Sequence, residues 1–260
     1  MNTRTIIVCI LIKAFTSLAF HAAPMKMSSK TPSVVVATGA NGGIGKSFCE
    51  HYSQQGSKVI AVCRSGEDIK KMNLPNTEII EGIDVTCDAS VKKLADFLEQ
   101  SDLKVDILIN NAGSAARGDS LDEIVYNDAV KAFEVNAVGP LRVTKQLYDR
   151  RLLTSPGCKV GLITSRMGSM KDNTSGGRYA YRMSKAALNA AGVSLAFDLK
   201  PLGVSVAILH PGWVRTAMTN FDGLISPKES VSGMVKILED ELDLNTSGTW
   251  WHTNGEVLQW

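Results

Sequence analysis

Beyond Pro32 the chain alternates between short apolar segments rich in β-branched residues and longer segments with apolar residues at helical spacing. Short apolar runs of this kind are typical of buried parallel strands, and the longer segments are typical of helices that cover a sheet. This alternation predicts an α/β protein with a doubly wound parallel sheet of about seven strands and helices on both faces. The expected strands are 34–38, 58–63, 78–83, 105–110, 159–164, 204–210 and 248–253. The expected helices are 43–55, 88–100, 129–152, which Pro140 should perturb, and 179–199.

The composition supports one folded domain over residues 33–260 and excludes several functional classes. Hydrophobic residues make up 44% of the 260 positions, which excludes disorder as the dominant state. A net charge of +2 without a long basic run gives no indication of nucleic-acid binding. The five cysteines contain no CxxC pair and the four histidines are scattered, so we expect neither a disulfide-stapled fold nor a metal site. We expect Cys49 and Cys63 to be small buried hydrophobic residues.

The first 32 residues differ in character from the rest. Arg4 precedes an apolar run that is too short and too interrupted to span a bilayer stably. The charged start, the apolar middle and the small residues Ser17 and Ala19 resemble a secretory signal peptide. Residues 17–24 also resemble the signal-plus-transit junction of algal proteins sent to complex plastids. We therefore expect residues 1–32 to be a targeting or disordered segment that directs the chain to the secretory route or a plastid. The alternative is an unprocessed extension of a cytoplasmic enzyme.

A glycine-rich turn follows the first expected strand. From Thr38 the chain reads Thr-Gly-Ala-Asn-Gly-Gly-Ile-Gly. Glycines permit a tight turn and close approach of the backbone to a ligand, and the following helix presents free amide groups to a phosphate. Between a buried strand and a helix, such a turn indicates dinucleotide binding at a single Rossmann-type sheet. The residues expected to contact the dinucleotide here are Gly39, Asn41, Gly43, Ile44 and Gly45.

The end of the second expected strand bears on the choice of cofactor. An acid at this place would bind the free 2′-hydroxyl of NAD(H), but the chain has Arg64 instead. A guanidinium can hold a 2′-phosphate by charge and by paired hydrogen bonds, so we favour NADP(H) over NAD(H). The alternative is that Arg64 is a solvated surface residue. The other residues expected at this edge of the sheet are Asp84, Val85, Asn111, Ala112 and Gly113.

Tyr181 and Lys185 lie four residues apart on an expected helix, so both face the same way. A nearby ammonium favours the phenolate and lowers the pKa of a tyrosine. Such a tyrosine can give a proton to a carbonyl oxygen, or take one from an alcohol, near neutral pH. Ser165 ends the fifth expected strand and could donate a hydrogen bond to the same oxygen. By itself such a pair is more often a partly buried tyrosine beside a surface lysine.

The motifs occur in a definite order, which is Thr38–Gly45, Asn110–Gly113, Asn136, Ser165, Tyr181–Lys185 and Pro211–Gly212. Together they resemble the short-chain dehydrogenase/reductase family over residues 33–260. The resemblance implies that Tyr181 is the general acid/base and that Ser165 polarises the substrate carbonyl. It also implies that Lys185 binds the nicotinamide ribose and lowers the tyrosine pKa, while Asn136 holds a water that links Lys185 to a proton relay. The further contacts that it implies on the nicotinamide side are Pro211, Gly212, Val214 and Thr216, together with Tyr181 and Lys185.

Residues 209–216 and 247–260 look like those of sniffer-type and C-signal-type carbonyl reductases. This resemblance implies reduction of a carbonyl, an aldehyde or ketone, to an alcohol, and the short segment 217–226 suggests an open site and a small or variable substrate. Gly42 stands where NADP-preferring relatives often carry a basic residue, so the cofactor prediction depends on Arg64 alone. Two alternatives stay open: a cofactor-binding signalling protein with little turnover, and a secondary-alcohol dehydrogenase that works in the oxidising direction.

The expected environment of the site is apolar and its expected partners are few. Analogy with relatives that pair through their two long helices makes a homodimer or homotetramer plausible. A carbonyl or alcohol substrate is expected, whereas a nucleic-acid partner and a stable membrane span are not. The residues expected to form a mostly apolar substrate pocket are Met167, Met170, Trp213, Met218 and Phe221.

Overall fold

The computed structural model describes residues 33–118 and 120–260. The targeting or disordered segment expected over residues 1–32 therefore lies outside the described residues. Within the described ranges, no helix combines the length and the apolar character needed to cross a bilayer.

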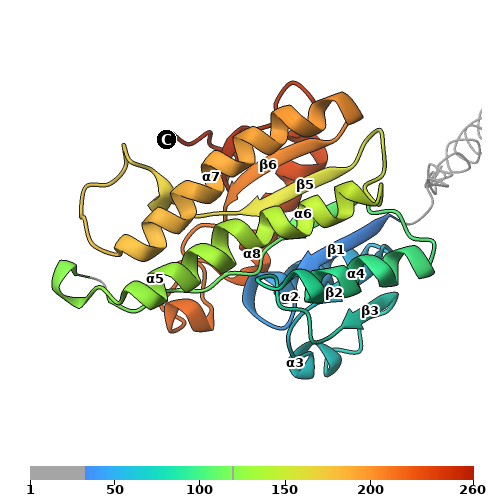
Figure 1. Cartoon of the computed structure of the whole chain (residues 1–260), viewed down its shortest axis with the longest axis horizontal. Coiled ribbons are helices and arrows are strands. Elements are labelled where there is room, and N and C mark those ends of the chain that lie inside the picture. The colour runs from blue at the N-terminus through green and yellow to red at the C-terminus, as the bar shows by residue number, and fades with distance from the viewer. Residues whose placement is uncertain (1–32, 119) are drawn as a thin grey trace, which may run out of the picture. The chain divides into compact units, whose positions relative to one another are not determined.

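Seven strands form one parallel sheet in the order β3-β2-β1-β4-β5-β6-β7 (Figure 1). The strand order reverses between β1 and β4, so a crevice for a ligand is expected at the carboxyl ends of these two strands. The strands are β1 (Val34–Thr38), β2 (Lys58–Val62), β3 (Thr77–Ile80), β4 (Ile107–Asn110), β5 (Lys159–Ile163), β6 (Ser205–His210) and β7 (Trp250–His252). This architecture confirms the predicted Rossmann-type doubly wound sheet.

Helices cover both faces of the sheet and enclose two separate hydrophobic cores. One core includes α4, α6 and α7, and the other includes α2 and α8. The helices are α2 (Gly43–Gln54), α3 (Glu67–Lys70), α4 (Asp88–Gln100), α5 (Tyr126–Phe133), α6 (Gly139–Asp149), α7 (Tyr179–Leu199) and α8 (Pro227–Lys236). Short 3₁₀ turns occur at Leu121–Glu123, Arg166–Gly168, Lys200–Leu202 and Ala217–Thr219.

Successive strand residues contribute to opposite cores, because side chains alternate across a sheet. In β1, Val36 packs with the α4 side, whereas Val35 and Ala37 pack with the α2 side. Both faces are thus apolar, which explains why the strands read as continuous apolar runs. Cys49 and Cys63 are buried free thiols, as predicted.

The expected single helix over residues 129–152 is interrupted. A π-helical turn, Glu134–Val138, separates α5 from α6, and the Gly139 N–H donates to the Glu134 carbonyl within it. Pro140 lies in the first turn of α6, has no N–H, and would clash with the carbonyl four residues earlier in a regular helix. The wider π turn accommodates the proline, and such turns are frequent at functional sites.

Two helices were absent from the sequence prediction. One is α3, and the other is α8, which continues into a π-helical turn, Ile237–Glu241. The signals for α8 were present: Ser226 accepts a hydrogen bond from the Glu229 N–H in a capping box, and Pro227 occupies the first turn. The strand expected over 78–83 ends at Ile80, because Gly82 adopts a φ of +72°.

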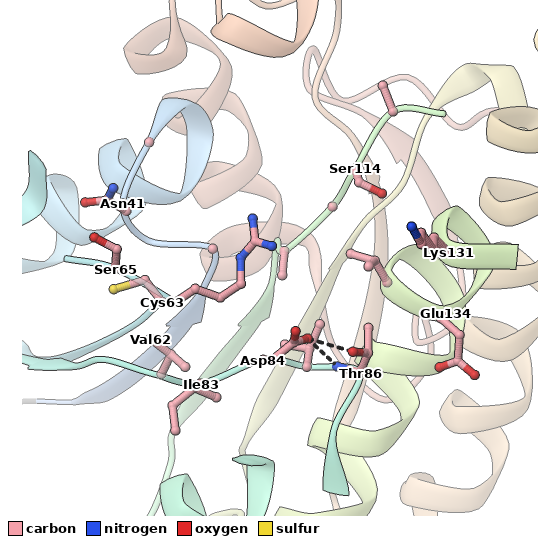
Figure 2. Close-up of a pocket in the computed structure, with 18 of the residues that line it drawn as sticks. Asn41, Val62, Cys63, Ser65, Ile83, Asp84, Thr86, Ser114, Lys131 and Glu134 are labelled. Carbon is pink, nitrogen blue, oxygen red and sulfur yellow. Dashed lines mark hydrogen bonds between the residues drawn. The ribbon is translucent and has the colours of Figure 1, made fainter. Parts of the chain in front are cut away.

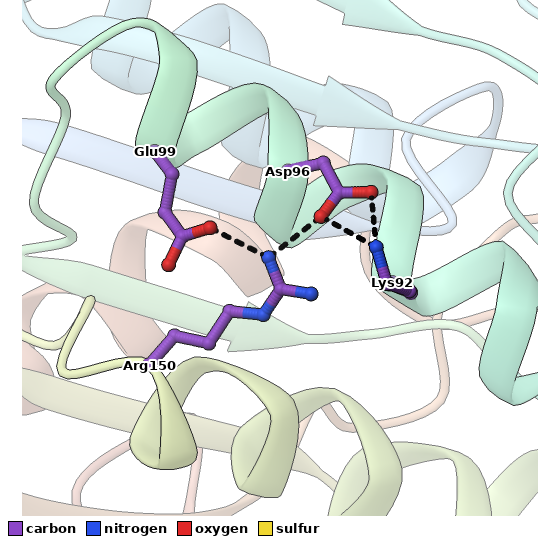
Figure 3. A network of polar contacts seen from close by, with 4 residues as sticks. All are labelled: Lys92, Asp96, Glu99 and Arg150. Atoms are coloured by element: carbon purple, nitrogen blue, oxygen red, sulfur yellow. Dashed lines mark hydrogen bonds and ion pairs between the residues drawn. The ribbon is translucent and has the colours of Figure 1, made fainter.

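An ionic network joins α6 to α4 on the outside of the sheet (Figure 3). Arg150 Nη1 lies 2.6 Å from an Asp96 oxygen and 2.7 Å from a Glu99 oxygen. Lys92 Nζ lies 2.8 Å from the second oxygen of Asp96. Partly exposed pairs of this kind contribute at most about 1 kcal/mol each, so the network stabilises helix packing modestly.

Candidate active site

The glycine-rich turn packs closely against the residues that follow β4. Gly39 has a φ of +66°, and a Cβ there would lie 2.9 Å from the Ala112 Cα. A Cβ on Gly45 would lie 2.3 Å from a backbone oxygen of the same turn. Asn111 Nδ2 donates to the Thr38 carbonyl at 2.9 Å and holds the turn against β4. These positions require glycine because the backbones approach closely.

A groove of about 1250 Å³ runs along the carboxyl edge of the sheet beside this turn (Figure 2). In Figure 2, Asn41 and Ser65 lie on one side of it and Lys131 and Glu134 on the other. The predicted cofactor residues that line the groove are Gly39, Asn41, Arg64, Asp84, Val85, Ala112 and Gly113.

Four predicted cofactor residues near the turn do not line this groove: Gly43, Ile44, Gly45 and Asn111. Gly43 packs against Thr216, and a Cβ on it would lie 3.0 Å from the Thr216 Cγ2. Ile44 packs against the core on the α2 side. Gly45 and Asn111 make contacts within the glycine-rich turn, so their role in the site is to fix the shape of that turn.

The far wall of the groove was missed by the sequence reasoning. It comes from the segment after β4, from α5 and from the π turn, and consists of Ser114, Ala115, Arg117, Asp128, Val130, Lys131, Glu134 and Val135. The remaining lining residues that were not predicted are Gly42, Val62, Cys63, Ser65, Ile83 and Thr86. The lining residues at the ends of β2 and β3 could have been predicted, because they neighbour residues that were assigned to the site from the positions of those strands. The exposed face of α5, by contrast, carries no sequence pattern that marks a groove.

Asn41 has a local structural role. Its Oδ1 accepts hydrogen bonds from the backbone N–H groups of Asp68 at 2.9 Å and Ile69 at 3.1 Å. These are N–H groups of the first turn of α3, which lack partners within that helix. Asn41 therefore holds α3 beside the turn, and its Oδ1 is already occupied there.

Two charged residues face the groove from neighbouring strand ends. Asp84 Oδ1 accepts hydrogen bonds from the Thr86 N–H at 2.9 Å and the Thr86 hydroxyl at 2.8 Å (Figure 2). These bonds hold the pKa of Asp84 below its usual value, and the positive charges of Arg64 and Arg142 lower it further. Arg64 is exposed, and no carboxylate of the described residues lies within ion-pair distance of it. Its guanidinium is therefore available to an anionic group in the groove.

Ser165, Tyr181 and Lys185 come together where β5 meets α7. The Ser165 side chain lies near enough to the Tyr181 hydroxyl to act on the pKa of the phenol, which it lowers. Lys185 Nζ lies 5.7 Å from the centre of the Tyr181 ring and donates to the Ile163 carbonyl at 2.8 Å. The predicted juxtaposition of a serine, a tyrosine and a lysine is therefore present in the structure.

Asn136 lies fully buried in the π turn and joins the groove to α7. Its Oδ1 accepts from the Ser114 N–H at 2.8 Å, and its Nδ2 donates to the Ser114 carbonyl at 2.9 Å. Nδ2 also lies 2.9 Å from Ser184 Oγ, which in turn donates to the Tyr181 carbonyl at 2.8 Å. The amide side chain is thus fully engaged with protein groups.

The effect of Lys185 on the tyrosine pKa differs from the prediction. Burial raises the pKa of Tyr181, while the Ser165 side chain and the charge of Arg178 act in the opposite direction. Burial also lowers the pKa of Lys185 from 10.5 to about 8. The predicted lowering of the tyrosine pKa is therefore not found for the protein alone, because the burial of the phenol outweighs the groups that lower its pKa.

The four residues predicted on the nicotinamide side follow β6. Pro211 and Val214 are buried, and Gly212 adopts a φ of +81°. Ser230 of α8 donates to the Pro211 carbonyl at 2.6 Å, so α8 supports this segment. None of these residues, Thr216 included, lines the groove described above.

A sequence model of a protein family identifies the family of the chain. The model of the short chain dehydrogenase family matches residues 33–223. The chain belongs to the short-chain dehydrogenase family. This membership confirms the predicted family and makes the protein an oxidoreductase of a fold that binds a nicotinamide cofactor.

Two curated relatives match this short-chain dehydrogenase over nearly all of their own length. The 1-hydroxy-2-glutathionyl-2-methyl-3-butene dehydrogenase of Rhodococcus sp. (strain AD45) is 39% identical over 233 residues, which are 88% of this chain and 100% of that protein. The C-signal protein of Myxococcus xanthus is 43% identical over 162 residues, which are 60% of this chain and 93% of that protein.

Two solved structures match this short-chain dehydrogenase closely in fold. The NADPH-bound carbonyl reductase from chicken fatty liver has a TM-score of 0.80 at 30% identity, and covers 89% of this chain and 100% of its own. The carbonyl reductase Sniffer of D. melanogaster has a TM-score of 0.79 at 28% identity, with the same two coverages of 89% and 100%.

The apolar residues expected around the substrate of this short-chain dehydrogenase are mostly exposed. The exposed fractions are 76% for Met170, 57% for Trp213, 49% for Met218 and 68% for Phe221. These four side chains are therefore not core residues.

Proposed function

We propose that this short-chain dehydrogenase reduces a small aldehyde or ketone to an alcohol with NADPH, and that Tyr181 is the general acid. One observation carries the proposal: the Ser165–Tyr181–Lys185 cluster lies at the same edge of the sheet as the groove, and that groove contains an unpaired Arg64. A proton donor and a site for an anionic dinucleotide are thus combined at the carboxyl ends of one parallel sheet, where such sheets bind ligands.

The groove suits an adenine dinucleotide that carries a 2′-phosphate. Gly39 and Gly113 keep the floor of the groove free of side chains, and a Cβ on Gly42 would meet nothing within 4 Å. Arg64 would hold the phosphate through charge and a forked pair of hydrogen bonds. The NADPH-bound chicken carbonyl reductase supports this choice of cofactor. The bound nicotinamide would supply the hydride.

The cluster would handle the proton. The Tyr181 hydroxyl would donate a proton to the substrate oxygen, and the Ser165 hydroxyl would hydrogen-bond to the same oxygen and orient it. The ammonium of Lys185 would stabilise the phenolate left on Tyr181. Tyr181 would then regain its proton through Lys185, and Lys185 would in turn be reprotonated from a water held by the backbone carbonyl of Asn136, to which Pro140 offers no N–H.

The test is to follow NADPH absorbance while the purified protein is offered a panel of aldehydes and ketones, with NADH measured in parallel. We expect turnover on at least one carbonyl and a higher specificity constant with NADPH. Binding of NADPH without turnover on any member of a broad panel would refute the proposed activity and would favour a signalling role. The relative named C-signal is the reason for testing that alternative. The intact cluster argues against it, because a protein that only binds cofactor needs no proton donor.

The oxidising direction uses the same residues. The Rhodococcus relative is named as a dehydrogenase, and Tyr181 would then accept the proton of an alcohol. Measuring NADP⁺ reduction with the alcohol product of each active carbonyl would compare the two directions in one set of assays.

A further inference from the structure

A loop over residues 166–178 joins Ser165 to α7, the helix that carries Tyr181. It returns to α7 through three successive residues with positive φ: Gly176 at +63°, Gly177 at +64° and Arg178 at +51°. A non-glycine residue rarely adopts this left-handed conformation, so the end of the loop needs support from other groups.

Arg182, the residue after Tyr181, supplies that support with three nitrogens. Its Nε donates to the Gly177 carbonyl at 3.2 Å, its Nη1 to the Met167 carbonyl at 3.4 Å, and its Nη2 lies 3.0 Å from Ser175 Oγ. Its backbone N–H also donates to the Arg178 carbonyl at 2.9 Å. The guanidinium thus reaches both the start and the end of the loop, which its rigid fork of donors makes possible.

The start of the loop bears directly on the site. The Met167 N–H donates to Ser165 Oγ at 3.2 Å, so the backbone that Arg182 contacts also orients the serine hydroxyl. The middle of the loop is held by other groups: the Ser169 hydroxyl donates to the Gln259 carbonyl at 2.7 Å, and the Lys171 N–H donates to the Trp260 carbonyl at 3.1 Å. Removal of Arg182 would therefore remove the side chain that bridges the two ends of the loop and leave its middle in place.

We infer that Arg182 is a positioning residue that closes the loop between Ser165 and Tyr181 and so sets the distance between the two groups that bind the substrate oxygen. This inference rests on the proposed function. All of the side-chain contacts of Arg182 given above go to the loop, so it acts through other residues. A displacement of about 1 Å in such a site can cost about 100-fold in rate.

The experiment compares Arg182→Gln and Arg182→Lys with the wild type and with Arg150→Gln. Arg150 is a matched control, because it also makes several ionic hydrogen bonds but joins α4 to α6 away from the loop. We expect Arg182→Gln to lower kcat about 10- to 100-fold, with little change in the Kd for NADPH, because the groove is built by other residues. Arg182→Lys keeps the charge but has one nitrogen for three acceptors, so we expect an intermediate kcat.

A second readout is independent of activity. Limited digestion with trypsin, followed by mass spectrometry, reports how often the loop opens. We expect cleavage after Arg178 to become at least about tenfold faster in Arg182→Gln, and cleavage after Lys171 to change little, because the tail at Trp260 still holds it. Arg150→Gln should change neither.

The two readouts separate the failure of this inference from the failure of the proposed function. If no carbonyl is reduced, faster cleavage after Arg178 still shows that Arg182 closes the loop. Unchanged cleavage overturns the inference, and so does a kcat that falls no further than in Arg150→Gln. If Arg182→Gln fails to fold, Arg182→Lys decides by the same two criteria.

Discussion

Replacing Lys185 with methionine should reveal how much the buried ammonium destabilises the cofactor-free protein. The side chain is only 4% exposed, and burial lowers its pKa from 10.5 to about 8. In the unfolded chain the same amine keeps its proton to about 10.4. Below pH 8 the folded state must therefore hold a charge that it disfavours, and the difference corresponds to about 3 kcal/mol.

The sign of the pH dependence follows from which state binds more protons. Between pH 8 and about 10.4 the unfolded state keeps the proton that the folded state has released, so stability from this group rises with pH. The free energy of unfolding of Lys185→Met relative to the wild type should be highest at pH 7 and should fall by about 2 kcal/mol by pH 9.5. The absolute difference also contains the lost hydrogen bond to the Ile163 carbonyl and the lost packing of the side chain, so the change between the two pH values is the quantity to compare.

Urea unfolding at both pH values, followed by tryptophan fluorescence without cofactor, measures the difference. Lys145→Met is the matched control: its side chain is 73% exposed on α6, so its effect should be nearly the same at both pH values. The buried thiols and Tyr52 are the same in the wild type and both variants, so their contributions to the pH dependence cancel in the differences in unfolding free energy. A Lys185→Met difference that is equal at pH 7 and pH 9.5 would refute the claim that this lysine is buried as an unfavourable cation.

Three other predictions follow from the site. Tyr181→Phe should lower turnover by about 10²- to 10⁴-fold, whereas Tyr179→Phe, on the same helix but 39% exposed, should not; steady-state NADPH oxidation compares them. Arg64→Asp should move the ratio of specificity constants toward NADH, since the carboxylate repels a 2′-phosphate and can accept from a 2′-hydroxyl; an unchanged ratio would leave Arg64 as a solvated surface residue. Gly45→Ala should cost about 1–3 kcal/mol in urea unfolding, because its Cβ would lie 2.3 Å from a backbone oxygen, and Gly42→Ala, with nothing within 4 Å, should cost much less.

The sheet and the turn could be predicted because their signals are local. The apolar runs at 34–38 and 159–163 are strands in the structure, and the glycines after Thr38 occupy the strand-to-helix turn assigned to them. Parallel strands need apolar side chains on both faces, so composition alone marks them. The order of the motifs then predicted that Ser165, Tyr181 and Lys185 lie together at one edge of the sheet, which no single motif could have indicated.

The features that were missed or mistaken depend on tertiary packing. The α5 wall of the groove consists of side chains such as Lys131 and Val130, which look like any exposed helix face. The tyrosine pKa was judged from the spacing to Lys185, which says nothing of how deeply the two groups are buried. Burial reverses the expected direction, and only the packed structure reveals it.

The π turn shows how a local irregularity can serve the site. Pro140 predicted a perturbed helix, and its effect is to widen the turn that contains Asn136. Within that turn the Asn136 side chain bonds to Ser114, which lines the groove, and to Ser184, which bonds to the Tyr181 backbone. A regular helix through these residues would shift every later side chain around its axis, by about 100° for each residue gained or lost. The π turn therefore places Asn136 so that its single buried amide connects the groove to the tyrosine, and a substitution that restored a regular helix would disturb both at once.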